Sequence, residues 1–308
     1  MNILPVEKLN KKLNSDAIAE VELAEELYHD QLAQAAELIA QNAEEKPIVL
    51  LSGPSGSAKT TTAHRLKELL EEKSLKTHVI SMDNYFLPLN GLSGDELSRI
   101  DLESPDRLDL ELLSEHLDRF WRCLPTQLPR FDFTDQSRKS GRLLCRGEKE
   151  PVILEGIHAL NPEVVGAIGE HSTGIYVSVR TRLSAKDKLL HPSMIRLMRR
   201  LVRDRLFRGR NTEDIIRSFK SVQRGEQLYI MPYKGSAEID IDTFMSFETA
   251  VYSSELLPYL EEVSPDYEFY GMVKDMLGFL EQITPLSKEV VPEGSIVREF
   301  VGGSMYDS

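Results

Sequence analysis

The chain has 308 residues, 41% of them hydrophobic, which is enough to bury one substantial core as a large α/β domain with appendages or as two small domains. Its formal net charge of -13 argues against nucleic acid or an anionic membrane as a partner, because both favour a basic surface. Cys123 and Cys145 have no disulfide or zinc spacing, the N-terminus lacks a signal pattern and no apolar run could span a bilayer, so we expect a cytoplasmic protein that binds a small molecule.

Residues 15–45 predict one or two amphipathic helices. Apolar side chains recur there at helical spacing among Glu and Gln: Ile18, Val21, Ala24, Leu27, Leu32, Ala35, Leu38 and Ile39. These helices would either pack on the main domain or pair the subunits of a homo-oligomer, since both arrangements use the same pattern.

A glycine-rich loop follows the apolar run 48–51 and precedes a helical pattern at 61–73. It consists of Gly53, Pro54, Ser55, Gly56, Ser57, Ala58, Lys59 and Thr60, and Thr61 follows it. Backbone N–H groups of such a P-loop and the positive end of the next helix bind phosphate, Lys59 can reach the β and γ phosphates, and Thr60 can ligate Mg²⁺. We therefore predict ATP and Mg²⁺ as cofactors, with the nucleotide bound by these loop residues together with Thr61. Ala58 stands where glycine is usual, so its Cβ could resist the required dihedral angles, and a turn that binds nothing is the alternative.

Two carboxylates come directly after the next apolar runs. Asp83 follows residues 78–82, and Glu155 follows residues 152–154. Ligands of open α/β sheets bind beyond the carboxyl ends of the strands, so both carboxylates should face the crevice of the P-loop. We assign Glu155 to the metal and Asp83 to the base that accepts a proton from an attacking hydroxyl. A capping or turn role would explain either residue alone.

The segments 100–106 and 129–133 could line an acceptor pocket. Aromatic side chains can stack on a planar base, and a carboxylate can accept hydrogen bonds from two sugar hydroxyls. However, Phe131 and Phe133 alternate like ordinary strand residues with one buried face, which leaves a core role open. Residues 91–94 and 134–141 predict polar loops.

Seven arginines lie within fifteen positions of this acidic chain. They are Arg196, Arg199, Arg200, Arg203, Arg205, Arg208 and Arg210. Residues 196, 200 and 203 recur at the spacing of one helix face, and Gly209 and Asn211 suit a helix stop at the end of this run. Folded over a triphosphate, such a helix would stabilise transition-state charge and exclude water. The alternative is a solvated helix that acidic neighbours such as Asp204 neutralise.

Strand-like runs at 48–51, 78–82, 152–154, 175–179 and 239–244 alternate with helical patterns. This alternation predicts an α/β P-loop NTPase fold with a parallel sheet of about five strands flanked by helices. We expect an N-terminal helical appendage at 1–45, the P-loop domain at 46–262, and a C-terminal helix (268–282) with an irregular tail packed on the core at 263–308.

Together these motifs resemble the phosphoribulokinase and uridine kinase family, in particular bacterial uridine kinase-like nucleoside kinases. The resemblance covers about residues 46–260 and is carried by residues 53–60, 81–85, 103–106, 129–133 with 137–138, 152–157, 199–204 and 208–210. It implies that the protein transfers the γ-phosphoryl group of ATP to the 5′-hydroxyl of a nucleoside.

The resemblance also implies roles for single residues. Asp83 matches the base and Glu155 the carboxylate of the metal site. Glu103 matches the residue that holds the ribose hydroxyls, and Tyr85 a pocket aromatic. The family's basic residues fall on Lys59, Arg203 and Arg208 at the phosphates and on Arg200 and Arg210 near the nucleoside.

The base pocket departs from the family pattern, because Phe131 and Gln136 stand where its pyrimidine kinases have a tyrosine and a histidine. Loss of the phenolic hydroxyl removes a donor, so a preference for uridine or cytidine does not carry over. Two alternatives stay open: a kinase of a sugar phosphate, pantothenate or glycerate, and an ATP-binding regulator without catalysis. The presence of both Asp83 and Glu155 argues against the regulator.

Overall fold

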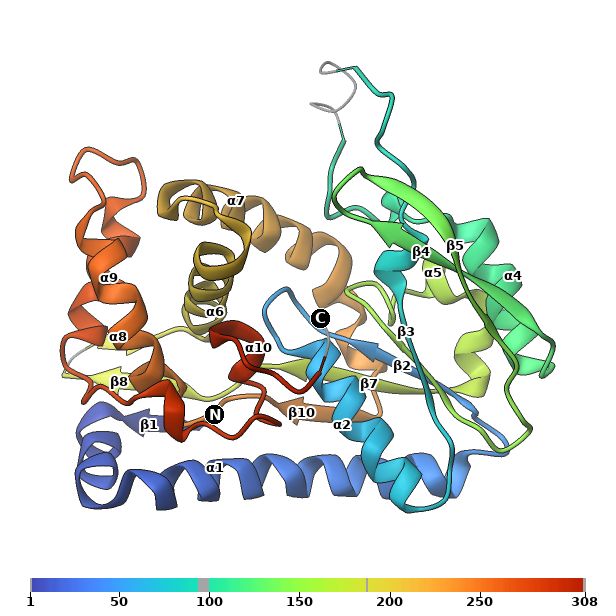
Figure 1. Ribbon diagram of the computed structural model, residues 1–308, viewed down its shortest axis with the longest axis horizontal. Coiled ribbons are helices and arrows are strands. Elements are labelled where there is room, and N and C mark those ends of the chain that lie inside the picture. The colour runs from blue at the N-terminus through green and yellow to red at the C-terminus, as the bar shows by residue number, and fades with distance from the viewer. Residues whose placement is uncertain (1, 94–99, 187, 307–308) are drawn as a thin grey trace.

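A five-stranded parallel sheet forms the centre of the molecule (Figure 1). The computed structural model describes residues 2–93, 100–186 and 188–306. The strands are β2 (Ile48–Ser52), β3 (His78–Ser81), β6 (Val152–Glu155), β7 (Ser172–Ser178) and β10 (Ile239–Asp242), in the order β10-β7-β2-β6-β3. All five predicted strands are present, which confirms the parallel sheet. Strand β2, which leads into the P-loop, lies in its middle.

The side chains of β2 alternate between two hydrophobic cores. Val49 and Leu51 belong to the larger cluster, whereas Ile48 and Leu50 belong to the smaller cluster on the other face of the sheet. Helices cover both faces: α2 (Lys59–Glu72), α4 (Leu110–Trp121), α5 (Pro162–Val165), α6 (Pro192–Arg208), α7 (Thr212–Gly225), α8 (Glu248–Glu261), α9 (Tyr270–Leu280) and α10 (Arg298–Val301). None of the helices in the described part of the chain is long and apolar enough to cross a membrane.

The N-terminal helix α1 (Val6–Asn42) packs on the main domain. It consists of two helices joined at Asp16, whose backbone is extended and whose carboxylate accepts a hydrogen bond from the Ala19 N–H at 3.0 Å. Leu32, Ala36 and Ile39 are buried in the larger core. Part of the predicted apolar stripe is therefore buried within the chain, whereas Ile18 and Leu27 are each 59% exposed.

Two smaller sheets were not predicted from the sequence, apart from the strand-like alternation at Phe131 and Phe133. Strand β1 (Ile3–Pro5) pairs with β8 (Arg182–Ala185), which pairs with β9 (Lys188–Leu190). Strands β4 (Thr126–Asp132) and β5 (Ser137–Leu144) form a hairpin. The loop predicted at 134–141 is therefore wrong from Ser137 onward, because polar residues on this exposed hairpin carry no apolar alternation. Of the loop predicted at 91–94, residue 94 lies outside the described residues.

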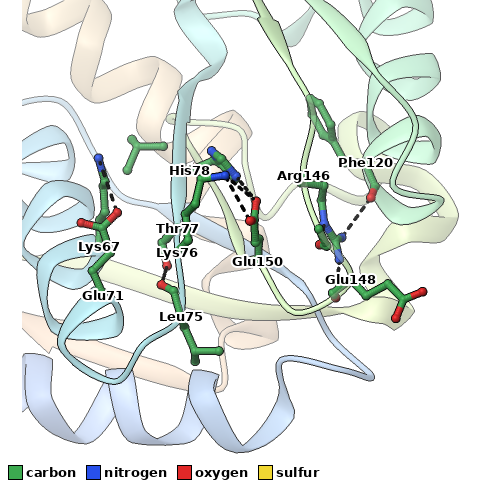
Figure 2. Close-up of polar contacts among 12 residues, drawn as sticks. Lys67, Glu71, Leu75, Lys76, Thr77, His78, Phe120, Arg146, Glu148 and Glu150 are labelled. Carbon is green, nitrogen blue, oxygen red and sulfur yellow. Dashed lines mark hydrogen bonds and ion pairs between the residues drawn. The ribbon is translucent and has the colours of Figure 1, made fainter.

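Polar contacts hold the amino ends of β3 and β6, at the edge of the sheet opposite the P-loop (Figure 2). His78 Nε2 lies 2.7 Å from Glu150 Oε2, and Lys76 donates to both oxygens of the same carboxylate. The Arg146 guanidinium donates to the carbonyls of Phe120 and Glu148 at 2.9 and 2.7 Å. These hydrogen bonds and ion pairs are structural, and they lie at the end of the sheet away from the P-loop.

Candidate active site

The P-loop needs its glycines and bends around Ala58. A Cβ at Gly53 would lie 2.1 Å from the Val177 carbonyl oxygen, so only glycine fits. Gly56 has φ +76°, and Ala58 has φ 64° and ψ 39° at the N-cap of α2. Alanine thus adopts the left-handed conformation that its Cβ was expected to resist. Its methyl group cannot cap the helix, which leaves the first-turn N–H groups to an external acceptor.

The side chains of the loop also fit a phosphate. The Lys59 ammonium lies across the loop and donates to the Pro54 carbonyl at 3.3 Å. Ser57 is fully buried, and its hydroxyl has no hydrogen-bond partner among the described residues. Such an unpaired donor is costly unless an anion accepts from it.

Asp83 and Glu155 lie within electrostatic reach of each other and of Lys59. Asp83 is in the 3₁₀ turn η1 (Met82–Tyr85). Although its side chain reaches solvent, the enclosing protein raises its pKa by desolvation, while Lys59 and Arg208 act in the opposite direction. Glu155 is only 5% exposed, and desolvation together with the charge of Asp83 raises its pKa to about 7.

This donor set fits a magnesium ion that keeps several of its ligands from phosphate and water. The described residues contain no group of three or more His, Cys, Asp or Glu side chains placed to hold a metal. Mg²⁺ in kinases usually takes only one or two carboxylates from the protein. Glu155 and the Thr60 hydroxyl would hold it, and its charge would relieve the repulsion between Glu155 and Asp83.

Two of the seven arginines clamp helix α6 onto the P-loop. Arg196 forms a buried pair with Glu226 and donates to the Ser55 carbonyl at 3.0 Å. Arg199 is fully buried, pairs with Glu248 and donates to the Gly56 carbonyl at 3.0 Å. Both side chains are therefore structural, so neither the solvated helix nor the phosphate lid describes them.

The buried carboxylate of Asp204 gathers the arginines that were predicted to face phosphate. Arg203 Nε lies 2.8 Å from its Oδ1, Arg208 Nη1 3.4 Å from the same oxygen, and Arg210 Nη1 3.6 Å from Oδ2. Arg200 donates to the Ser55 hydroxyl at 2.6 Å, and its buried Nε has no partner in the described chain. Burial and the charge of Arg203 lower the pKa of Arg200 to about 10. The cluster therefore carries positive charge that a phosphate would offset.

The predicted acceptor residues are only partly brought together. Glu103 feels the charges of Arg200 and Lys59, although desolvation is the largest influence and raises its pKa. Gln136 lies in the turn of the β4–β5 hairpin and donates to the Phe133 carbonyl at 2.9 Å, so its side chain is folded back on its own turn.

The pocket role predicted for Tyr85 needs correction. Tyr85 is fully buried, with its hydroxyl 2.9 Å from His116 Nδ1, because the turn at η1 directs it into the smaller core. The next residue, Phe86, is half-buried and makes edge contacts with Phe131 and Phe133 at 5.8 and 6.4 Å between ring centroids. Phe131 is buried, as the core alternative had it, whereas Phe133 is 58% exposed.

Sequence reasoning also missed polar residues around the site. Ser81 lies beside Glu155 and acts to lower its pKa. His158 is 2% exposed, lies near the backbone of Glu103 and Tyr229, and has no hydrogen-bond partner for its Nδ1 among the described residues. Burial, the largest influence, lowers the pKa of His158 to about 4. Its place three residues after Glu155, beyond the end of β6, was the one available signal.

A cavity lies beside this site. It measures about 660 Å³ and is bordered by Pro54 of the P-loop, Tyr176 of β7 and Arg196 of α6. Neither Asp83 nor Glu155 lines it. This cavity is therefore not the space that the two carboxylates face.

A P-loop that leaves the central strand of a five-stranded parallel sheet, with carboxylates after two neighbouring strands, defines a P-loop kinase. The family model described as "Phosphoribulokinase / Uridine kinase family" matches residues 48–250, and the chain belongs to this family.

Individual relatives agree with this assignment. The uridine kinase of Lactobacillus helveticus (strain DPC 4571) is 29% identical over 197 residues, which cover 63% of this chain and 86% of that protein. The uridine kinase of Borreliella burgdorferi (strain ZS7) is 31% identical over 206 residues, which cover 67% of this chain and 90% of that protein. The crystal structure of YFH7 from Saccharomyces cerevisiae, a chain with a circular permutation, matches with a TM-score of 0.50 and 13% sequence identity. The match covers 71% of this chain and 98% of that chain. This last similarity concerns the fold alone.

Proposed function

We propose that the protein transfers the γ-phosphoryl group of ATP to the 5′-hydroxyl of a nucleoside, with uridine as the first candidate. The observation that carries the proposal is the convergence of Lys59, Asp83, Glu155 and Arg208 at the P-loop. The relatives called uridine kinase support the choice of acceptor.

In this reaction Asp83 accepts the proton of the attacking hydroxyl as the new O–P bond forms and the bond to the β-phosphate oxygen breaks. Its raised pKa makes it a stronger base than an ordinary aspartate. Lys59 and Arg208 lie where negative charge develops on the transferred group. A bound Mg²⁺ would neutralise charge on the phosphates.

The acceptor would lie between Glu103 and the aromatic cluster of Phe86, Phe131 and Phe133. The Glu103 carboxylate can accept from two ribose hydroxyls, and the exposed ring of Phe133 offers a face to a base. Glu103 would repel a second phosphate, so a phosphorylated sugar is the less favoured acceptor. Because Gln136 is folded back, we expect weak discrimination between bases.

The replacement of Asp83 by Asn tests the base. We expect kcat to fall by about 10²- to 10⁴-fold while nucleotide affinity changes by less than about threefold. Asp118→Asn, an exposed change on α4, is the matched control. Near-normal turnover in the Asp83 variant would remove it as the base.

The acceptor is tested by coupled ADP release with uridine, cytidine, purine nucleosides, pantothenate, glycerate and ribulose 5-phosphate. A response to nucleosides alone supports the proposal. A response only to another compound would retain the kinase and replace the acceptor, and nucleotide binding without any turnover would favour the regulator.

A further inference from the structure

The C-terminal segment, defined here as residues 298–306, lies along one face of the P-loop helix α2 (Figure 1). The Thr61 hydroxyl donates to Glu299 Oε2 at 2.6 Å. The ring of Tyr306 stacks on His64 with 5.6 Å between centroids, and its hydroxyl donates to Glu68 at 2.6 Å. Positions 61, 64 and 68 share one face of a helix. The segment lies outside the residues that the family model matches.

The same segment also packs against helix α6, which contacts the other side of the P-loop. The Phe300 ring lies under the Arg199 guanidinium at 5.2 Å, and Arg199 in turn donates to the Gly56 carbonyl. A Cβ at Gly302 would lie 2.7 Å from the ring of Phe207, so the chain passes close against α6. The C-terminal segment therefore joins the two helices that hold the loop.

Glu299 places a third carboxylate near the proposed metal ligands. Its partner Thr61 directly follows Thr60 in the first turn of α2, and the negative charge of Glu299 is felt at Glu155. Thr61 is 2% exposed, and its single hydroxyl proton is given to Glu299. In this arrangement the Thr61 hydroxyl has no proton left for a phosphate, so a nucleotide contact of Thr61 would use its backbone N–H.

We propose that Glu299 is a positioning residue of the magnesium site: it fixes the first turn of α2 through Thr61, and its charge favours the cation over bare phosphate. The inference rests on the proposed function, since it concerns the same nucleotide site. A negative charge here attracts Mg²⁺ and repels nucleotide phosphates. Both effects increase the factor by which Mg²⁺ tightens nucleotide binding, which is a coupling between two ligands.

The test is to measure ADP binding by calorimetry with EDTA and with saturating Mg²⁺. Glu299→Gln keeps a hydrogen-bond acceptor but loses the charge. For this variant we expect the ratio of the two dissociation constants to fall about fivefold, as for a unit charge roughly 10 Å from a divalent cation at an effective dielectric constant of about 70. The Glu299→Gln variant should bind metal-free ADP more tightly than the wild type does. Glu293→Gln removes an exposed charge from the neighbouring stretch and is the matched control, with an unchanged ratio.

Glu299→Ala removes the acceptor as well. We expect the same loss of coupling together with faster amide hydrogen exchange at residues 59–62, which Glu299→Gln should not show. Melting temperatures establish that both variants are folded, and the Gln variant carries the test if the Ala variant is not.

Three results would overturn the inference. An unchanged ratio in Glu299→Gln, with both dissociation constants equal to those of the wild type, would show that Glu299 is outside the metal site. Equal tightening with and without Mg²⁺ would mean that the segment competes with the nucleotide. Wild-type protein that binds no ADP under either condition would overturn the proposed function as well, which distinguishes that failure from the other two.

Discussion

The replacement of Glu155 by Gln should stabilise the protein while abolishing its activity. Glu155 is buried beside Asp83, and its pKa is raised from 4.5 to about 7. This rise corresponds to at most about 3 kcal/mol of unfavourable free energy for ionisation in the folded state. Gln has the same shape and can hydrogen-bond Ser81, but it carries no charge.

The sign follows from the two pKa values of Glu155. Between pH 4.5 and about 7 the unfolded chain loses a proton that the folded protein retains, so the wild type loses stability as the pH rises through this window. The loss is complete above pH 7. Without divalent metal we expect Glu155→Gln to exceed the wild type by about 2 kcal/mol in unfolding free energy at pH 8, because some of the penalty is relaxed by water, and to equal it near pH 4.

The assay is urea unfolding followed by circular dichroism at pH 4, 6 and 8 in EDTA. Glu72→Gln, an exposed change on α2, serves as the control and should show no such pH dependence. A difference between Glu155→Gln and the wild type that is the same at pH 4 and pH 8 would refute the reasoning. So would a variant that keeps both its activity and its response to Mg²⁺.

Two further predictions concern the loop and the opposite end of the sheet. Ala58→Gly should change the unfolding free energy by less than about 1 kcal/mol, because glycine relieves the left-handed φ but loses the buried methyl group and makes the unfolded chain more flexible. Ala58→Val should lower the unfolding free energy by at least about 2 kcal/mol, because a β-branched side chain is more strained at this φ. Equal effects of the two replacements in thermal unfolding would contradict this prediction. For Glu150, partial burial opposes ionisation, but hydrogen bonds from His78, the Gly147 N–H and Lys76 outweigh it and lower its pKa to about 2. The stabilisation by ionised Glu150 is therefore present above pH 4.5 and is lost as the pH falls towards 2. In urea unfolding, Glu150→Gln should lower the unfolding free energy by about 1 kcal/mol at pH 7 and leave it unchanged near pH 2. A loss of unfolding free energy that does not depend on pH would refute the assignment.

The frame of the site could be predicted from the sequence because its signals are local. Each strand of the main sheet is a short apolar run, and the P-loop and Asp83 or Glu155 follow such runs directly. The carboxyl ends of parallel strands lie on the same side of the sheet, so residues that directly follow such strands are brought together by their position in the sequence.

The arginine helix shows where local signals stop. The six arginines of α6 and Arg210 just after it have the same side chain, and their spacing alone does not separate their roles. Arg199 becomes a buried clamp because Glu248 meets it from α8, whereas Arg203, Arg208 and Arg210 gather on Asp204. Burial and the nearest opposite charge decided these roles, and both depend on how the helices pack.

A shift of one position explains the correction at the pocket. Tyr85 is the last residue of a 3₁₀ turn and Phe86 directly follows it, so the direction of each depends on the turn geometry and on the core beneath it.

The sequence by itself determined the α/β class, the order of the strands along the chain, the P-loop and its two carboxylates, since periodicity and spacing encode these within a few residues. The tertiary structure decided that the C-terminal segment lies on α2 and that Glu299 meets Thr61, a contact between residues 238 positions apart. No local pattern marks that contact, because it forms only when separate elements pack around a common core.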